Sequence, residues 1–92
     1  MNERLEAVVK GRVQMVMFRD YTQRKASSLK LTGEVRNRSD GTVFVIAEGP
    51  HAVLEKLVQK LHRGSMLSHV ESVEVMWVPT TGEYSTFAIA YD

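Results

Sequence analysis

The sequence contains no cysteine among its 92 residues, which excludes a disulfide framework and any metal site built on thiolates. Its charge is nearly balanced, at +1 with the histidines neutral, so no overall field favours a nucleic acid or an anionic membrane as partner. No apolar run approaches the roughly 20 residues of a membrane-spanning helix, and the charged N-terminus does not resemble a secretion signal. These absences predict a cytoplasmic protein that binds neither membranes nor nucleic acid.

The sequence also offers little that could hold a metal ion. Its histidines, His51, His62 and His69, lack the close spacing of a ligand set, so we expect them at the surface and expect neither a metal nor a cofactor. No linker or repeat divides the chain, which predicts a single domain over residues 1–92. We expect this domain to be a monomer.

Apolar and polar residues alternate over several stretches, with the period of half-buried strands. The predicted strands cover residues 4–13, 34–38, 42–48, 70–78 and 87–91. Asp40-Gly41 predicts a tight hairpin turn between the second and third strands, because glycine accepts the positive φ that such a turn requires.

Two stretches instead carry apolar residues three and four positions apart, the pattern of amphipathic helices. The first covers residues 18–31. The second follows Gly49-Pro50 and ends at Gly64, since proline suits a helix start and glycine a helix end.

The predicted order is therefore β-α-β-β-α-β with a short extra C-terminal strand. An antiparallel sheet with both helices on one face buries both helical stripes, so we predict an α+β sandwich with a ferredoxin-like order. RNA-recognition modules share this order but expose several aromatic residues on the third strand. That strand reads TVFVIAE here, with one aromatic residue and no basic flank, which argues against RNA binding.

The first strand-to-helix turn is the strongest candidate site. A helix N-terminus presents unpaired N–H groups and a positive dipole end, which together bind anions. Arg19 falls in the first helical turn, where a cation does not favour the helix but where its planar fork suits phosphate. A surface ion pair with a carboxylate such as that of Asp20 is the competing interpretation.

Asn37 is the second candidate. It lies within a predicted strand, where asparagine is disfavoured, and between Arg36 and Arg38. Its amide could orient a water molecule for attack. The alternative is an ordinary polar residue close to the hairpin turn.

Together these residues resemble the acylphosphatase signature, in which VQ-x-V-x-FR is followed by N-x-x-DG. The resemblance covers nearly the whole chain. It is carried by Gly11-Arg12-Val13-Gln14, Val16, Phe18-Arg19, Ala26, Leu29, Leu31-Thr32-Gly33, Val35, Asn37, Asp40-Gly41, Ala47-Glu48-Gly49-Pro50, Gly82-Glu83 and Phe87.

The resemblance implies hydrolysis of acyl phosphates to a carboxylate and inorganic phosphate, without metal or cofactor. It implies that Arg19 holds the phosphoryl group and that Asn37 positions the attacking water. Backbone amides of the loop from Gln14 to Phe18 would assist Arg19; the loop residues are Gln14, Met15, Val16, Met17 and Phe18.

Three positions depart from the family pattern. Glycine is usual where this chain has Met15, frequent at Met17, and common at Lys30 after the first helix. Glycine lets loop amides converge on phosphate in conformations that are unfavourable for other residues. The alternative function is therefore a catalytically impaired module, similar to acylphosphatase, that binds an anion or a partner protein.

Overall fold

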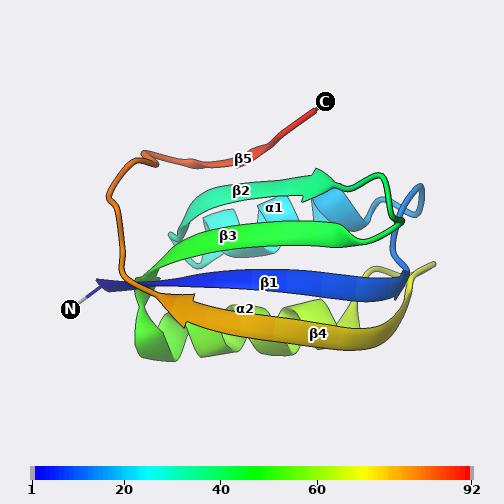
Figure 1. Cartoon of the computed structure of the whole chain (residues 1–92), viewed down its shortest axis with the longest axis horizontal. Helices are drawn as coiled ribbons and strands as arrows, with labels where there is room; N and C mark the ends of the chain where they lie inside the picture. The colour runs from blue at the N-terminus through cyan, green and yellow to red at the C-terminus, as the bar shows by residue number, and fades with distance from the viewer. Residues whose placement is uncertain (1, 92) are drawn as a thin grey trace.

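In the computed structural model, which describes residues 2–91, the chain forms a five-stranded sheet with two helices packed on one face (Figure 1). The elements are β1 (Asn2–Arg12), α1 (Phe18–Ser28), β2 (Thr32–Asn37), β3 (Val43–Pro50), α2 (His51–Arg63), β4 (His69–Val78) and β5 (Phe87–Ile89). The strand order is β4-β1-β3-β2-β5. The predicted α+β sandwich is confirmed. Neither helix within the described residues has the length and apolar character needed to span a bilayer.

The closing strand gives the sheet its one parallel pairing. β1, β2, β3 and β4 pair antiparallel, as predicted, whereas β5 runs parallel to β2 with Gly33 opposite Phe87 and Val35 opposite Ile89. The sheet is therefore mixed. Tyr91, which was expected in the last strand, lies beyond β5 and is exposed.

The first helix is shorter than its apolar pattern predicts. It ends at Ser28, and Lys30 then takes a left-handed conformation with φ of 59°. The N–H groups of Lys30 and Leu31 bond to the carbonyls of Ser27 and Ala26, which satisfies two of the free acceptors at the helix end. This backbone turn, and not a loss of apolar periodicity, stops the helix.

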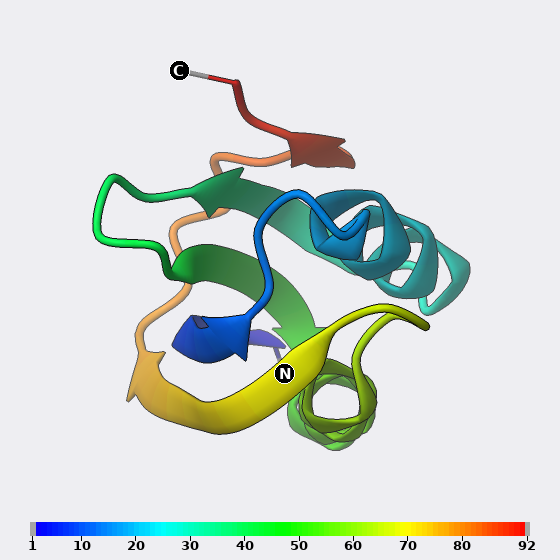
Figure 2. The same ribbon diagram turned by 90° about the vertical axis from the view of Figure 1, so that its right-hand side faces the viewer.

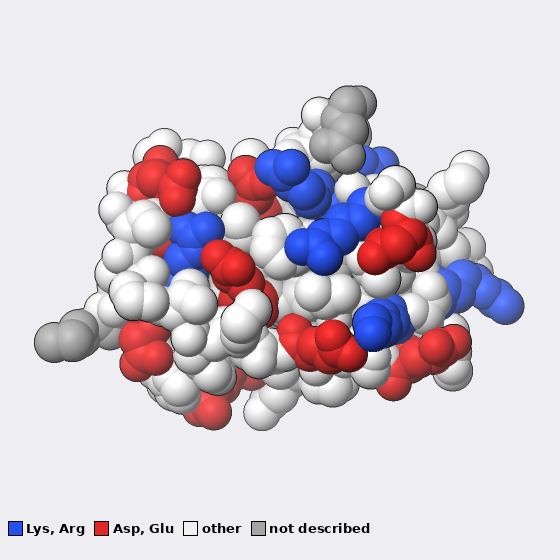
Figure 3. Space-filling view, viewed as in Figure 1, with Lys and Arg blue, Asp and Glu red and all other residues white. Residues whose placement is uncertain are grey.

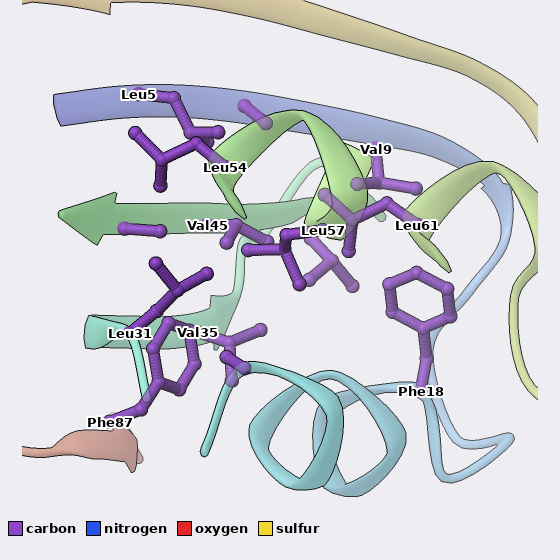
Figure 4. Close-up of a cluster of buried hydrophobic side chains, with 14 of the residues drawn as sticks. Leu5, Val9, Phe18, Leu31, Val35, Val45, Leu54, Leu57, Leu61 and Phe87 are labelled. Atoms are coloured by element: carbon purple, nitrogen blue, oxygen red, sulfur yellow. The ribbon is translucent and has the colours of Figure 1, made fainter. Parts of the chain in front are cut away.

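The core lies between the sheet and the helices (Figure 4). Leu5, Ala7 and Val9 of β1 point to the helical side and are fully buried, as their alternation predicts. Leu54 and Leu57 of α2 meet them from the other layer. The opposite face of the sheet has no helical cover, and acidic and basic side chains are interspersed across it (Figure 3).

A buried carboxylate on β3 holds the long connection between β4 and β5. Glu48 is 4% exposed and accepts hydrogen bonds from the Thr80 hydroxyl at 2.8 Å and from the backbone N–H groups of Thr81 and Gly82, each at 3.0 Å. The Arg4 guanidinium donates to Glu48 at 3.2 Å and to Glu83 at 2.9 Å. These bonds fix the path of the connection, and so deliver β5 to the edge of β2.

Because of this network, the free energy of unfolding decreases at acidic pH. Burial alone would raise the pKa of Glu48, but hydrogen bonds from Thr81, Thr80 and Gly82 outweigh it and lower the pKa to about 2, from an ordinary value of 4.5. The carboxylate therefore stabilises the fold above pH 4.5, and this contribution declines as pH falls from about 4.5 to about 2.

We expect Glu48→Gln to reduce the free energy of unfolding at pH 7 by on the order of 2–3 kcal/mol, because charged hydrogen bonds are lost. Its stability should also fall less steeply than that of the wild type between pH 4.5 and 2, as measured by urea unfolding at a series of pH values. Glu74→Gln, at an exposed ion pair with Lys10, is the matched control with little expected effect. Equal pH slopes for the wild type and Glu48→Gln would contradict the assignment.

Candidate functional site

The loop that joins β1 to α1 lies at one end of the sandwich. The turn between β2 and β3 and the loop after α2 lie at the same end (Figure 1). Viewed from this end, the β1–α1 loop runs between the other two (Figure 2). Residues far apart in the sequence therefore meet here.

Contacts on both sides fix this loop. The Gln14 side-chain amide donates to the carbonyl of Arg38 at 2.7 Å and to that of Thr42 at 2.8 Å, both beside the β2–β3 turn. The Ser65 hydroxyl donates to the Val16 carbonyl at 2.9 Å from the loop after α2. Phe18, at the start of α1, is buried in the core. These hydrogen bonds and the buried Phe18 ring hold the loop against the β2–β3 turn, the loop after α2 and the core.

Two loop residues adopt the conformation that glycine favours. Met15 and Met17 each have φ of 61°, and Met17 is the N-cap of α1. Left-handed residues near a helix start are typical of loops whose successive N–H groups face one side and bind anions. No side chain caps the first turn of α1, so its N–H groups are not occupied in that way. Met15 and Met17 thus have the backbone conformation of such anion-binding loops, although neither is glycine.

The loop forms one wall of a pocket of about 210 Å³, to which Arg19 and Asn37 both contribute. The Arg19 guanidinium lies over the ring of Tyr91, with its carbon 5.0 Å from the ring centre. Asp20 pairs with Arg24 at 3.0 Å, and Arg19 makes no ion pair with any residue from 2 to 91. Within residues 2–91, Asp20 is therefore paired with Arg24 and not with Arg19.

Asn37 is the last residue of β2 and lies opposite Val43 of β3. Its side-chain oxygen Oδ1 is buried and accepts no hydrogen bond from the residues that the structure describes. A buried acceptor without a partner costs about 1–3 kcal/mol, so it is rarely left unused. The residue also contributes to the lining of the pocket.

Three side chains of the site were not predicted from the sequence. Gln14 was expected to contribute its backbone only, yet its side chain ties the loop to the hairpin. Ser65 and Tyr91 carried no signal, because each acts through one contact with a residue distant in sequence. Among residues 2–91, no group of three or more histidine or acidic side chains is placed to hold a metal ion.

The strained loop yields a stability prediction. Met15 is 99% exposed and its side chain buries nothing, while a left-handed conformation disfavours any residue with a β-carbon by about 1–2 kcal/mol. We expect Met15→Gly to raise the free energy of unfolding by about 0.5–1 kcal/mol, after the entropy of glycine in the unfolded chain is subtracted.

Urea unfolding measures this change. Met15→Ala is the control that keeps the β-carbon and should not stabilise, and Lys30→Gly repeats the test at the end of α1, far from the pocket. A Met15→Gly protein that is no more stable than Met15→Ala would show that the left-handed conformation carries no strain.

Nearly the whole chain is similar to known proteins of one family. The family model described as acylphosphatase matches residues 5–89. An acylphosphatase of Salinibacter ruber is 42% identical over 87 residues, which are 95% of this chain and 92% of that protein. An acylphosphatase of Thermus thermophilus is 48% identical over 79 residues, or 86% of this chain and 90% of that protein.

Comparison with solved structures points to the same family as comparison of the sequences. The crystal structure of acylphosphatase from Bacillus subtilis matches with a TM-score of 0.93 and 37% identity, over 99% of this chain and 100% of that one. Similarity thus extends over the sheet, both helices and the closing strand. The chain belongs to the acylphosphatase family, whose members are metal-independent enzymes that hydrolyse acyl phosphates.

Proposed function

We propose that Arg19 and the backbone amides of residues 14–18 hold the phosphoryl group of the acyl phosphate, and that Asn37 positions the attacking water. One observation carries this assignment: Arg19 and Asn37 line the same pocket, beside the β1–α1 loop. A guanidinium matches phosphate in charge and geometry, and a side-chain amide can form hydrogen bonds with water.

The reaction needs little beyond positioning and charge stabilisation. The water oxygen forms a bond to phosphorus, and the bond from phosphorus to the bridging oxygen breaks, so that the electron pair leaves with the carboxylate. The acyl phosphate dianion and one water thereby give a carboxylate anion and dihydrogen phosphate. Because a carboxylate is a good leaving group, no strong base is required, and the protein's part is to orient the water and neutralise charge.

The geometry of displacement also fixes the direction in which the acyl group leaves. Attacking and leaving oxygens lie roughly in line across phosphorus. Since Asn37 holds the water on the side of β2, the acyl group departs on the side of the loop away from Asn37.

The backbone conformation of Met15 favours the enzyme over the impaired module. Both methionines already have the left-handed φ that a glycine would supply, so the side chains do not force the loop into another shape. Met15 and Met17 are exposed and point away from the core. Phosphate binding by loop amides is therefore compatible with methionine at these positions.

Arg19→Ala should lower kcat/KM for acetyl phosphate by at least about 10³-fold, because a charge that stabilises the transition state is removed. Inhibition by inorganic phosphate should disappear as well, while the circular dichroism spectrum stays that of the wild type. Arg19→Lys should restore little activity, since a point charge does not reproduce the planar fork. Lys25→Ala removes the same charge from the same helix and should behave as wild type. Near wild-type turnover in Arg19→Ala would eliminate the assignment.

Asn37→Ala should separate catalysis from binding. Losing one hydrogen-bonding group that acts in the transition state reduces kcat by about 10²–10³-fold. The inhibition constant for inorganic phosphate should change only a few-fold, because Arg19 and the loop remain. The opposite outcome, a collapse of phosphate affinity with kcat preserved, would assign Asn37 to phosphate binding instead.

A further inference from the structure

Large apolar side chains are exposed on two neighbouring loops at the end of the sandwich that carries the phosphate pocket. Met15 is 99% exposed and Met17 71% exposed on the β1–α1 loop. Met66 is 98% exposed and Leu67 68% exposed on the neighbouring loop after α2. Solvent-facing apolar residues are ordinary when scattered, but a contiguous group on the rim of a reaction pocket indicates a binding surface.

A second, mainly apolar cavity of about 300 Å³ adjoins the first. Val16, Met17, Tyr21, Met66 and Leu67 line it, with Ser65 and the Asp20-paired Arg24 as its polar members. We call it the apolar groove. Met17 lines both the apolar groove and the phosphate pocket, so a molecule bound in one can extend over Met17 into the other.

We propose that the apolar groove binds the hydrocarbon part of the acyl group, so that this enzyme prefers acyl phosphates with hydrocarbon chains of about six to ten carbons. The inference rests on the proposed function, which places the phosphoryl group beside Arg19. It adds a subsite and a substrate class to that assignment.

The direction of the reaction supports this occupant. The acyl group leaves on the side of phosphorus away from Asn37. In the end-on view the β1–α1 loop separates the β2–β3 turn from the loop that carries Met66 and Leu67 (Figure 2). The apolar groove therefore lies across the loop from β2, on the side toward which the acyl group departs.

The side chains that line the apolar groove also favour a hydrocarbon chain as its occupant. Methionine is flexible and polarisable, so it adapts to a chain without fixed shape. The volume of about 300 Å³ is at the lower end of small-molecule sites. A hydrocarbon that enters the groove also covers Met17, Met66 and Leu67, which are otherwise in water.

Chain length provides the test. We would measure kcat/KM for acetyl, butyryl, hexanoyl and octanoyl phosphate, each below its micelle concentration. Each buried methylene should raise kcat/KM by about two- to fourfold. Burial of four of the six additional methylenes of octanoyl phosphate is therefore enough for it to exceed acetyl phosphate by at least about tenfold. Met66→Ser combined with Leu67→Ser should flatten this series and leave acetyl phosphate turnover unchanged. Met76→Ser, at a methionine of β4 that is 61% exposed, is the matched control and should leave the series as in the wild type.

A binding measurement keeps this test separate from catalysis. The 2-oxoalkylphosphonates carry a methylene in place of the bridging oxygen and cannot be hydrolysed. The 2-oxononyl compound should bind at least about tenfold more tightly than the 2-oxopropyl compound, and the double variant should remove the difference. If acetyl phosphate is not hydrolysed, the proposed function fails, and these affinities still report on the groove.

A flat chain-length series in the wild type would overturn the inference, as would a series that the double variant leaves unchanged. Two other results would also overturn it. If the double variant abolishes only binding to phosphatidylcholine vesicles, the surface contacts membranes. If it abolishes only self-association in analytical ultracentrifugation, the surface joins two copies of the chain.

Discussion

One side-chain amide joins the two parts of the site. Gln14 lies at the start of the loop beside α1, and its NH₂ group donates to two carbonyls of the hairpin whose first strand ends in Asn37. In the proposed mechanism, Arg19 beside the loop holds the phosphoryl group and Asn37 of β2 positions the water. A displacement of about 1 Å between two such groups would reduce catalysis strongly. The two bonds of Gln14 connect the elements that carry them.

The backbone of the loop is the second constraint, and it is independent of side-chain identity. Met15, Met17 and Lys30 occupy positions where glycine is usual, frequent or common in the acylphosphatase family, and all three have a φ near 60°. Such conformations persist in residues other than glycine only where the surroundings impose them. Hydrogen bonds to Val16 and from the end of α1 supply that restraint. A methionine or lysine can thus follow the main-chain path that glycine would take at these positions, at some loss of stability.

Much of the fold was predictable because local pattern and global packing agree. The alternation in β1 and the glycine that ends α2 depend on nearby residues alone, and both appear as expected. The parallel direction of β5 was not predicted, because it follows from the course of the preceding connection and from a buried Glu48 whose partners lie more than 30 residues away. Arg19 and Asn37 could be singled out from their positions in the predicted helix and strand and from the family resemblance. That they line one pocket depends on how the elements pack in three dimensions. Tyr91 and Ser65 act through single distant contacts and leave no periodic trace.

The short closing strand covers the edge of β2 and reaches the pocket. β5 pairs with β2 from Gly33 to Val35 and stops two residues before Asn37. An edge strand left bare is a template for pairing with another chain, and a neighbour that covers it removes this hazard. β5 ends at Ile89, and the chain continues to Tyr91, whose ring lies against the Arg19 guanidinium. Ile89 and Tyr91 both line the pocket, so the strand that closes the sheet also supplies part of the pocket wall.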